Sequence, residues 1–370
     1  MTTVSASDSY LDDATTTAAL LWNQLTRETR RLCAGERKHQ DGSPGGLSGR
    51  RESRYGLPAI AADASAHEEL ATAIGQIWPH RRVVGEEAEA RAWGHALESP
   101  PGTEIVSLDA LDGSVLFDTV TYGHGATAGL YRAGHGDAVE LLYTVTVNST
   151  GLALVYLAGE DAVFVGSACA EGAFRRVTAT DLWPVENIRH DVVACVAASP
   201  RHRELVAPLL ATDVDWQLPG QETTPHAGLT VVTTGGAPAA IGLVVARLAA
   251  LVLPNRQTLH DAAPMLALAA LDIPTFDERG NPVPYPALKA RFHELARPDA
   301  GHAAYHPVPR LVFSRRPELG RLLARRVFGR AEDGRRGARS HGPACRCDFP
   351  QTRPPVHEPA GGRQLGSSLR

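Results

Sequence analysis

Acidic side chains stand where apolar segments end. The stretch SLDALDGSVLF carries Asp109 and Asp112 three residues apart at the end of a predicted strand, followed by Gly113 and Ser114. The two carboxylates and the Leu111 carbonyl can converge on one point and form an all-oxygen site for a hard cation such as Mg²⁺. A cation would also relieve the repulsion between carboxylates packed so closely. The alternative is that the aspartates only shape a turn, which Asp favours.

Two further acidic motifs accompany this one. Glu86 and Glu87 follow the apolar segment RRVVG, and Asp261 precedes the apolar stretch AAPMLALAAL. Alone, the two glutamates are interpreted as solvated surface acids and Asp261 as the N-cap of a helix from Ala262. The order of the three motifs carries more information than any one of them.

This order resembles that of the inositol monophosphatase and fructose-1,6-bisphosphatase superfamily over roughly residues 10 to 295. That family carries Gly-Glu-Glu, Asp-Pro-x-Asp-Gly-Thr/Ser and Trp-Asp-x-Ala-Ala. The corresponding segments here are Gly85-Glu86-Glu87, Asp109-Ala110-Leu111-Asp112-Gly113-Ser114 and His260-Asp261-Ala262-Ala263. The chain departs from the family at Ala110, which replaces Pro, at His260, which replaces Trp, and at Gly235–Pro238, where the family has Gly-Ser-Ala.

The resemblance implies a site for two Mg²⁺ ions, and for a possible third. Glu86, Asp109 and the Leu111 carbonyl would bind the first ion, and Asp109, Asp112 and Asp261 the second. Two metals can clamp the attacking and the leaving oxygen of an in-line displacement. All four family acids are present, which indicates a working enzyme.

The resemblance also assigns the catalytic and phosphate-binding groups. Glu86 and the Ser114 hydroxyl would accept the proton of a metal-activated water, so Glu86, Asp109 and Ser114 form the catalytic set. Backbone N–H groups after the aspartates, at a predicted helix start, suit phosphate oxygens. The substrate-binding set is Gly113, Ser114, Asp112 and Asp261.

The resemblance also implies roles for four accessory residues. Lys38, in a loop over residues 34–56, and Asp63 are candidates for the weaker third metal site, although Lys38 is equally well interpreted as a solvated lysine. Glu87 is either a group behind the ligands or a solvated neighbour. Arg201 could contact the substrate, but a solvated first turn of a helix is the favoured interpretation. The glycine-flanked His124 and His135 are interpreted as part of a hairpin rather than as metal ligands.

The hydrophobic pattern predicts an α+β chain of stacked helix and sheet layers. Helices are expected at 7–33 and 62–78, antiparallel strands between 125 and 168, and one Ala-rich helix at 237–251. By the resemblance, the fold is a layered αβαβα sandwich. The expected parts are residues 1–185 and 186–328, which form two subdomains, and 329–370, a disordered Gly/Arg/Pro-rich tail.

Composition narrows the class of protein. The 370 residues are 43% hydrophobic, with a formal net charge of -4, so no electrostatic footprint for nucleic acid is present. No apolar run of 18 residues and no signal-peptide pattern occur, and the five cysteines are irregularly spaced. We therefore expect a cytoplasmic protein with neither nucleic acid nor membrane as partner. The resemblance implies a small phosphorylated substrate, and we expect a homodimer.

Three functions remain open. The first is a Mg²⁺-dependent hydrolase of small phosphomonoesters, such as an inositol phosphate, a sugar phosphate or a nucleotide-like compound. The second is a dedicated fructose-1,6-bisphosphatase or 3′-phosphonucleotide phosphatase. The third is a non-catalytic regulator that keeps the fold, against which the intact acid set argues.

Overall fold

The structure is a computed structural model that describes most of the chain. The described residues are 6–34, 51–52, 58–59, 61–85, 99–113, 116–117, 122–135, 139–169, 174–188, 192–196, 207, 209, 229–254, 259–293 and 308–338. The chain divides into a large unit, residues 1–332, and a small unit, residues 333–370. The account below concerns the large unit.

A seven-stranded sheet forms the first half of the large unit, and its strand order follows the sequence. β3 is parallel to β4, and every later neighbour is antiparallel. This agrees with the predicted antiparallel strands. The strands are β3 (Arg82–Gly85), β4 (Glu104–Asp112), β5 (Gly125–Ala133), β6 (Val139–Asn148), β7 (Leu152–Leu157), β8 (Ala162–Ser167) and β9 (Arg175–Val177). A separate antiparallel pair consists of β1 (Arg51–Glu52) and β2 (Pro58–Ala59).

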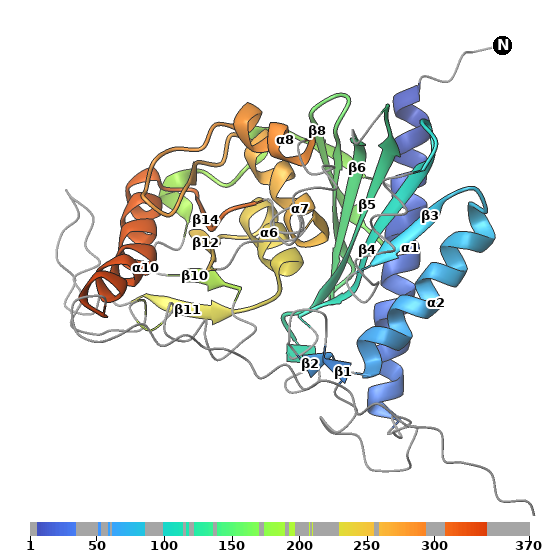
Figure 1. The fold of residues 1–370 in the computed structure, drawn as a ribbon, viewed down its shortest axis with the longest axis horizontal. Coiled ribbons are helices and arrows are strands. Elements are labelled where there is room, and N and C mark those ends of the chain that lie inside the picture. The colour runs from blue at the N-terminus through green and yellow to red at the C-terminus, as the bar shows by residue number, and fades with distance from the viewer. Residues whose placement is uncertain are drawn as a thin grey trace, which may run out of the picture. The chain divides into compact units, whose positions relative to one another are not determined.

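Two long helices cover one face of this sheet (Figure 1). α1 (Ala6–Cys33) packs on β5 and β6, and α2 (Ala61–Ile77) packs on β3 and β4. Each helix buries a stripe of apolar residues three or four positions apart, which is the spacing of one helical face. The buried stripes are Ala14, Ala18, Leu21 and Leu25 in α1, and Ala66, Leu70 and Ile74 in α2.

A buried arginine ties α1 to the sheet. Arg81 follows α2, forms an ion pair with Asp13 of α1, and donates from Nε to Glu104 Oε2 of β4 at 2.7 Å. Its guanidinium also lies 4.3 Å from the centre of the Trp78 ring. Because a buried charge needs such partners, these contacts fix the beginning of β4 against α1.

The second sheet has five strands in the order β11-β10-β12-β14-β13. β10, β11 and β12 are parallel to one another, and β14 is antiparallel to both of its neighbours, β12 and β13. The strands are β10 (Val192–Cys195), β11 (Thr230–Thr233), β12 (Ala250–Leu253), β13 (Thr275–Phe276) and β14 (Leu311–Ser314). The remaining helices in the described residues are α6 (Gly236–Val245), α7 (Leu259–Ala270), α8 (Tyr285–His293), α10 (Pro317–Ala338) and two short 3₁₀ turns, η2 (Ala179–Asp181) and η3 (Val185–Asn187).

Helices α6 and α7 lie between the two sheets, as Figure 1 shows. Alternate residues of β12 separate the layers: Leu251 faces the cluster of α6 and α7, whereas Val252 joins Leu323 of α10 on the opposite side. A strand covered on both faces must be apolar throughout, as the segment ALVL is. The order is helix, sheet, helix, sheet, helix, so the predicted αβαβα sandwich is confirmed.

The helix predicted over residues 237–251 is wrong at its C-terminal end. α6 stops at Val245, and residues 250–253 form β12. A short apolar run fits a buried helix and a buried strand equally well, so periodicity alone does not find this boundary. At the other end of the chain, α10 continues to Ala338, ten residues beyond the point where composition predicts a disordered tail.

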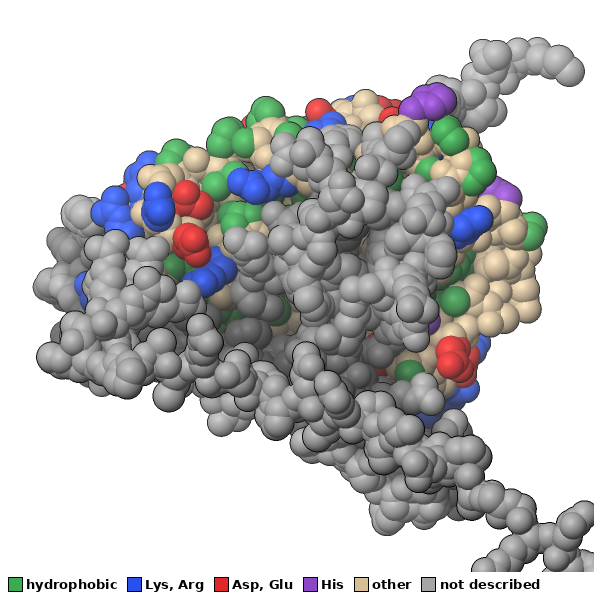
Figure 2. Space-filling model, viewed as in Figure 1, with side chains coloured by type: hydrophobic (Ala, Val, Ile, Leu, Met, Phe, Trp, Pro, Cys, Tyr) green, Lys and Arg blue, Asp and Glu red, His purple; other side chains and the backbone are tan. Residues whose placement is uncertain are grey.

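On the face shown in Figure 2, acidic and basic side chains of described residues lie interspersed rather than gathered by sign. A search of the described helices for one both long and apolar enough to cross a membrane finds no candidate.

Candidate functional site

The end of β4 directs Asp109 toward the central helices. Leu108 and Ala110 pack in the cluster of α1 and α2, and Ile105 packs in the cluster of α6 and α7. Side chains alternate along a strand, so Asp109, which has the parity of Ile105, lies on the α6 and α7 face. It is 3% exposed, and its Oδ1 accepts the N–H of Leu111 at 3.1 Å.

Asp112 contacts the first turn of α6. Its Oδ1 accepts the N–H of Gly236 at 3.2 Å, and its Oδ2 accepts the N–H of Ala237 at 2.6 Å. The residue at the N-cap of α6 is Gly235, which has no side chain to do this. A carboxylate at a helix N-terminus satisfies free N–H groups and matches the positive end of the helix dipole. Asp112 therefore caps α6 from 124 residues away along the chain.

Three glycines meet where β4, β5 and α6 come together. Gly113 has φ +80°, and a Cβ atom there would lie 3.1 Å from the carbonyl oxygen of Gly123 and 3.4 Å from Gly235 Cα. The Gly123 carbonyl accepts the N–H of Gly235 at 2.7 Å and the Thr234 hydroxyl at 3.1 Å. Larger residues at these positions would separate the backbones, so the glycines allow Asp112 to reach α6.

The Gly85-Glu86-Glu87 motif begins beside Asp109 in the sheet. β3 ends at Gly85, which pairs in register with Leu108, the residue before Asp109. A Cβ atom on Gly85 would lie 2.0 Å from Cε1 of His67, so this imidazole of α2 packs directly on the strand end. Sequence reasoning missed His67. Asp63, one helical turn earlier on α2, is 6% exposed.

The last motif stands at the beginning of α7. The helix starts at Leu259, so Asp261 belongs to its first turn rather than to a cap before Ala262. α7 packs against β4 and β5, the strands that hold Asp109 and Gly125. The predicted residues outside the description are Lys38, Glu86, Glu87, Ser114 and Arg201, together with the side chain of Asp261.

The donor set suits a hard cation. Asp109 and Asp112 supply carboxylate oxygens at one strand end, and carboxylates and carbonyls are the ligands that Mg²⁺ takes in proteins. Among the described side chains, no group of three acids, histidines or cysteines could hold a metal. Glu86 and Asp261, half of the expected acid set, are not among those side chains.

His124 is a buried residue at the open end of the β5–β6 hairpin. It lies just before β5, is 2% exposed, and packs edge-on against Phe117 with ring centres 4.7 Å apart. Neither ring nitrogen has a hydrogen-bond partner in the described part of the chain. Burial lowers the pKa of this imidazole to about 4. His124 therefore packs in an apolar environment just before β5, and β5 and β6 form the hairpin that the glycines predict.

Because the His124 imidazole is buried, the free energy of unfolding is expected to decrease as the pH is lowered. The unfolded chain binds a proton on His124 below its ordinary pKa of 6.5, whereas the folded chain does so only near 4. The contribution is thus complete above pH 6.5 and is lost as the pH falls toward 4, at up to about 1.4 kcal/mol per pH unit. We expect His124→Phe to flatten this dependence in urea unfolding measured from pH 7.5 to 5.

The matched control is His135→Asn, which changes an exposed histidine just after the other end of β5. It should retain the slope of the parent chain. A His124→Phe variant with the parent slope would contradict the assignment of the acid effect to His124.

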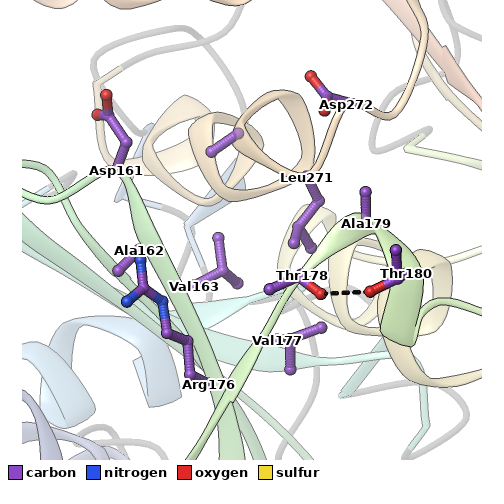
Figure 3. A pocket seen from close by; sticks show the side chains of 11 residues that line it. Asp161, Ala162, Val163, Arg176, Val177, Thr178, Ala179, Thr180, Leu271 and Asp272 are labelled. Atoms are coloured by element: carbon purple, nitrogen blue, oxygen red, sulfur yellow. Dashed lines mark hydrogen bonds between the residues drawn. The ribbon is translucent and has the colours of Figure 1, made fainter.

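A separate pocket of about 460 Å³ lies at the other end of α7 (Figure 3). Leu271 and Asp272 line it from the end of the helix, and Arg176 and Thr178 line it from β9 and the turn after it. At a rise of about 1.5 Å per residue, the ten residues from Asp261 to Leu271 span about 15 Å. This pocket is therefore distinct from the predicted acidic site.

The arrangement of layers and strands defines a fold class known from solved structures. The inositol monophosphatase of Thermotoga maritima has a TM-score of 0.52 and 12% identity, over 88% of this chain and 99% of that one. The chain has the inositol monophosphatase fold, so the resemblance drawn from the motifs is confirmed at the level of the fold.

Further solved structures were also found. Mycobacterium tuberculosis SuhB has a TM-score of 0.47 and 14% identity, over 85% of this chain and 92% of that one. The extragenic suppressor protein SuhB of Bartonella henselae has a TM-score of 0.45 and 13% identity, over 84% and 98%. Neither a protein-family model nor a curated protein matches the sequence.

Proposed function

We propose that this chain is a Mg²⁺-dependent phosphatase that hydrolyses a small phosphomonoester. The observation that carries the proposal is the end of β4, where Asp109 and Asp112 stand between two sheets against α6. The inositol monophosphatase fold supports it, and so do the parallel pairing of β3 with β4 and the packing of α7 against β4.

The residues that would hold the metals are Glu86, Asp109, Asp112, Asp261 and the carbonyl of Leu111. When bound, the cations would lower the pKa of a water molecule and neutralise the charge on the leaving oxygen. Register supports this grouping, since Gly85 pairs beside Asp109 and Glu86 follows Gly85. Asp63 and Lys38 would contribute to a third, weaker position, and Glu87 would lie behind the ligands.

The protein's own groups would orient the phosphate and move its protons. The backbone N–H groups of Gly113 and Ser114 would donate to phosphate oxygens, which is the preorganised stabilisation that favours developing charge. Glu86 and the Ser114 hydroxyl would accept the proton of the attacking water. The hydrogen bond that the Leu111 N–H donates to Asp109 would keep that carboxylate in one orientation.

The proposal extends to the setting of the enzyme. We place it in the cytoplasm as a homodimer, with a subdomain boundary near residue 185, between the seven-stranded and the five-stranded sheet.

The substrate is tested by phosphate release from a panel with an inositol monophosphate, fructose 1,6-bisphosphate, a 3′-phosphonucleotide and simple sugar phosphates. Hydrolysis of the bisphosphate or of the nucleotide alone would assign the narrower function. Release from none of them would leave the non-catalytic regulator.

Lithium and calcium are expected to inhibit. Li⁺ is small and hard like Mg²⁺, so it suits an all-oxygen position that Asp109, Asp112 and Asp261 would share. We expect uncompetitive or mixed inhibition by Li⁺ at concentrations on the order of millimolar, as the family resemblance implies. Ca²⁺ should inhibit because its bonds of about 2.3–2.6 Å exceed the 2.0–2.1 Å of Mg²⁺. The measurement is the initial rate of phosphate release at constant ionic strength, with Na⁺ as the control.

The Li⁺ result tests the second metal position, and the Ca²⁺ result tests the mechanism. Full activity in high Li⁺ would mean that His260, or the segment 235–238, alters the second metal position. Activity sustained by Ca²⁺ alone would contradict the mechanism with two magnesium ions.

A further inference from the structure

We infer that Gly235 is a positioning residue that lets the first turn of α6 orient Asp112 for metal binding. The inference rests on the proposed function, in which Asp112 is a metal ligand. It goes beyond that function because the proposed function assigns Gly235 no contact with metal or substrate. Its contribution is the space that its missing side chain leaves.

The geometry at Gly235 leaves no room for a larger residue. A Cβ atom there would lie 2.7 Å from Oδ1, 2.8 Å from Cγ and 2.9 Å from Oδ2 of Asp112. All three distances are shorter than real Cβ contacts, so the carboxylate would have to move. The backbone of Gly235 is extended, with φ -65° and ψ 165°, a conformation that any residue adopts. Glycine is thus required here by the neighbouring carboxylate and not by the backbone.

The peptide bonds of α6 fix where the carboxylate points. Gly236 and Ala237 donate to different oxygens of Asp112, so rotation of the carboxyl group would break one bond or both. An ionised carboxylate offers about four acceptor sites, and bonding to two N–H groups is compatible with binding a cation as well. Groups behind a metal ligand that orient it in this way commonly change metal affinity by about 10–100-fold when they are lost.

The same contacts join distant parts of the chain. Gly235 also donates its N–H to Gly123, and the Gly123 carbonyl lies against Gly113. Thus the turn after β4, the turn before β5 and the start of α6 hold one another in place. The unusual Gly-Gly-Ala-Pro segment fits this role: Gly235 admits the carboxylate, and Pro238 lies in the first turn of α6, where proline is tolerated.

The test compares Gly235→Ala with Gly242→Ala in the full chain. Gly242 lies in the same helix, and a Cβ atom there meets only the Leu248 side chain at 3.4 Å, so that variant controls for an added methyl group in α6. Mg²⁺ affinity is measured without substrate, by titration calorimetry and by the rise in unfolding temperature with added metal. We expect Gly235→Ala to fold and to bind Mg²⁺ about 10–100-fold more weakly, and Gly242→Ala to bind like the parent.

A second variant, Gly236→Pro, removes a hydrogen bond to Asp112 instead of adding a methyl group beside it. Gly236→Pro removes one donor at the first helical position, where proline is well accommodated, and leaves Gly235 unchanged. It should also weaken Mg²⁺ binding. Parent affinity in both folded variants would overturn the inference, and so would loss of cooperative unfolding in both, because the contact would then hold the fold instead. A parent that binds Mg²⁺ but releases no phosphate would reject the proposed function and leave the positioning role intact.

Discussion

Asp112→Asn is expected to reduce phosphate release by at least about 10³-fold while the chain still folds. The substitution keeps the size of the side chain but removes a negative charge that the second Mg²⁺ ion would need. A loss of that size corresponds to about 4 kcal/mol of transition-state stabilisation. The structure adds a cost to folding, because an amide has one acceptor oxygen and Asp112 uses two, for Gly236 and for Ala237. We therefore expect a loss of about 0.5–2 kcal/mol in unfolding free energy as well, the range for a lost helix cap.

The matched control is Asp181→Asn. Asp181 also accepts a backbone N–H with its carboxylate, from Thr178 at 2.8 Å, but it lies in η2, beside β9 and away from the strand end. Its variant should keep parent activity. Near-normal activity in a folded Asp112→Asn variant would show that Asp112 is not a ligand, whereas equal losses in both variants would point to a general defect.

Much of the fold can be predicted from local sequence patterns. The stripe of α1 recurs at a spacing of three or four residues, and the antiparallel strands alternate between turn glycines such as Gly151. Such features depend on neighbours in sequence, so they are visible without a structure. The strand end at Asp109 is visible for the same reason. β12 is not, because a segment buried on both faces loses the alternation that marks a strand.

The contacts that complete the site join residues far apart in sequence. Asp112 and Ala237 are 125 positions apart, and no local pattern links an aspartate to the helix that it caps. The requirement for glycine at 235 follows only from that contact. The glycines around His124 predict the hairpin of β5 and β6, but the burial of His124 depends on Phe117, to which no local pattern links it. His67 gave no signal in sequence, since one histidine on a helix is common.

The central claim is that the acids of this chain support hydrolysis only with a divalent cation. The most direct measurement is phosphate release from an inositol monophosphate by the full chain, after treatment with a chelator and then with Mg²⁺ restored. We expect the chelated protein to lose at least about 10³-fold in rate, because cations that activate water and neutralise the leaving group supply several kcal/mol. Restored Mg²⁺ should return the activity. A chelated protein that hydrolyses the ester at the full rate would contradict the account.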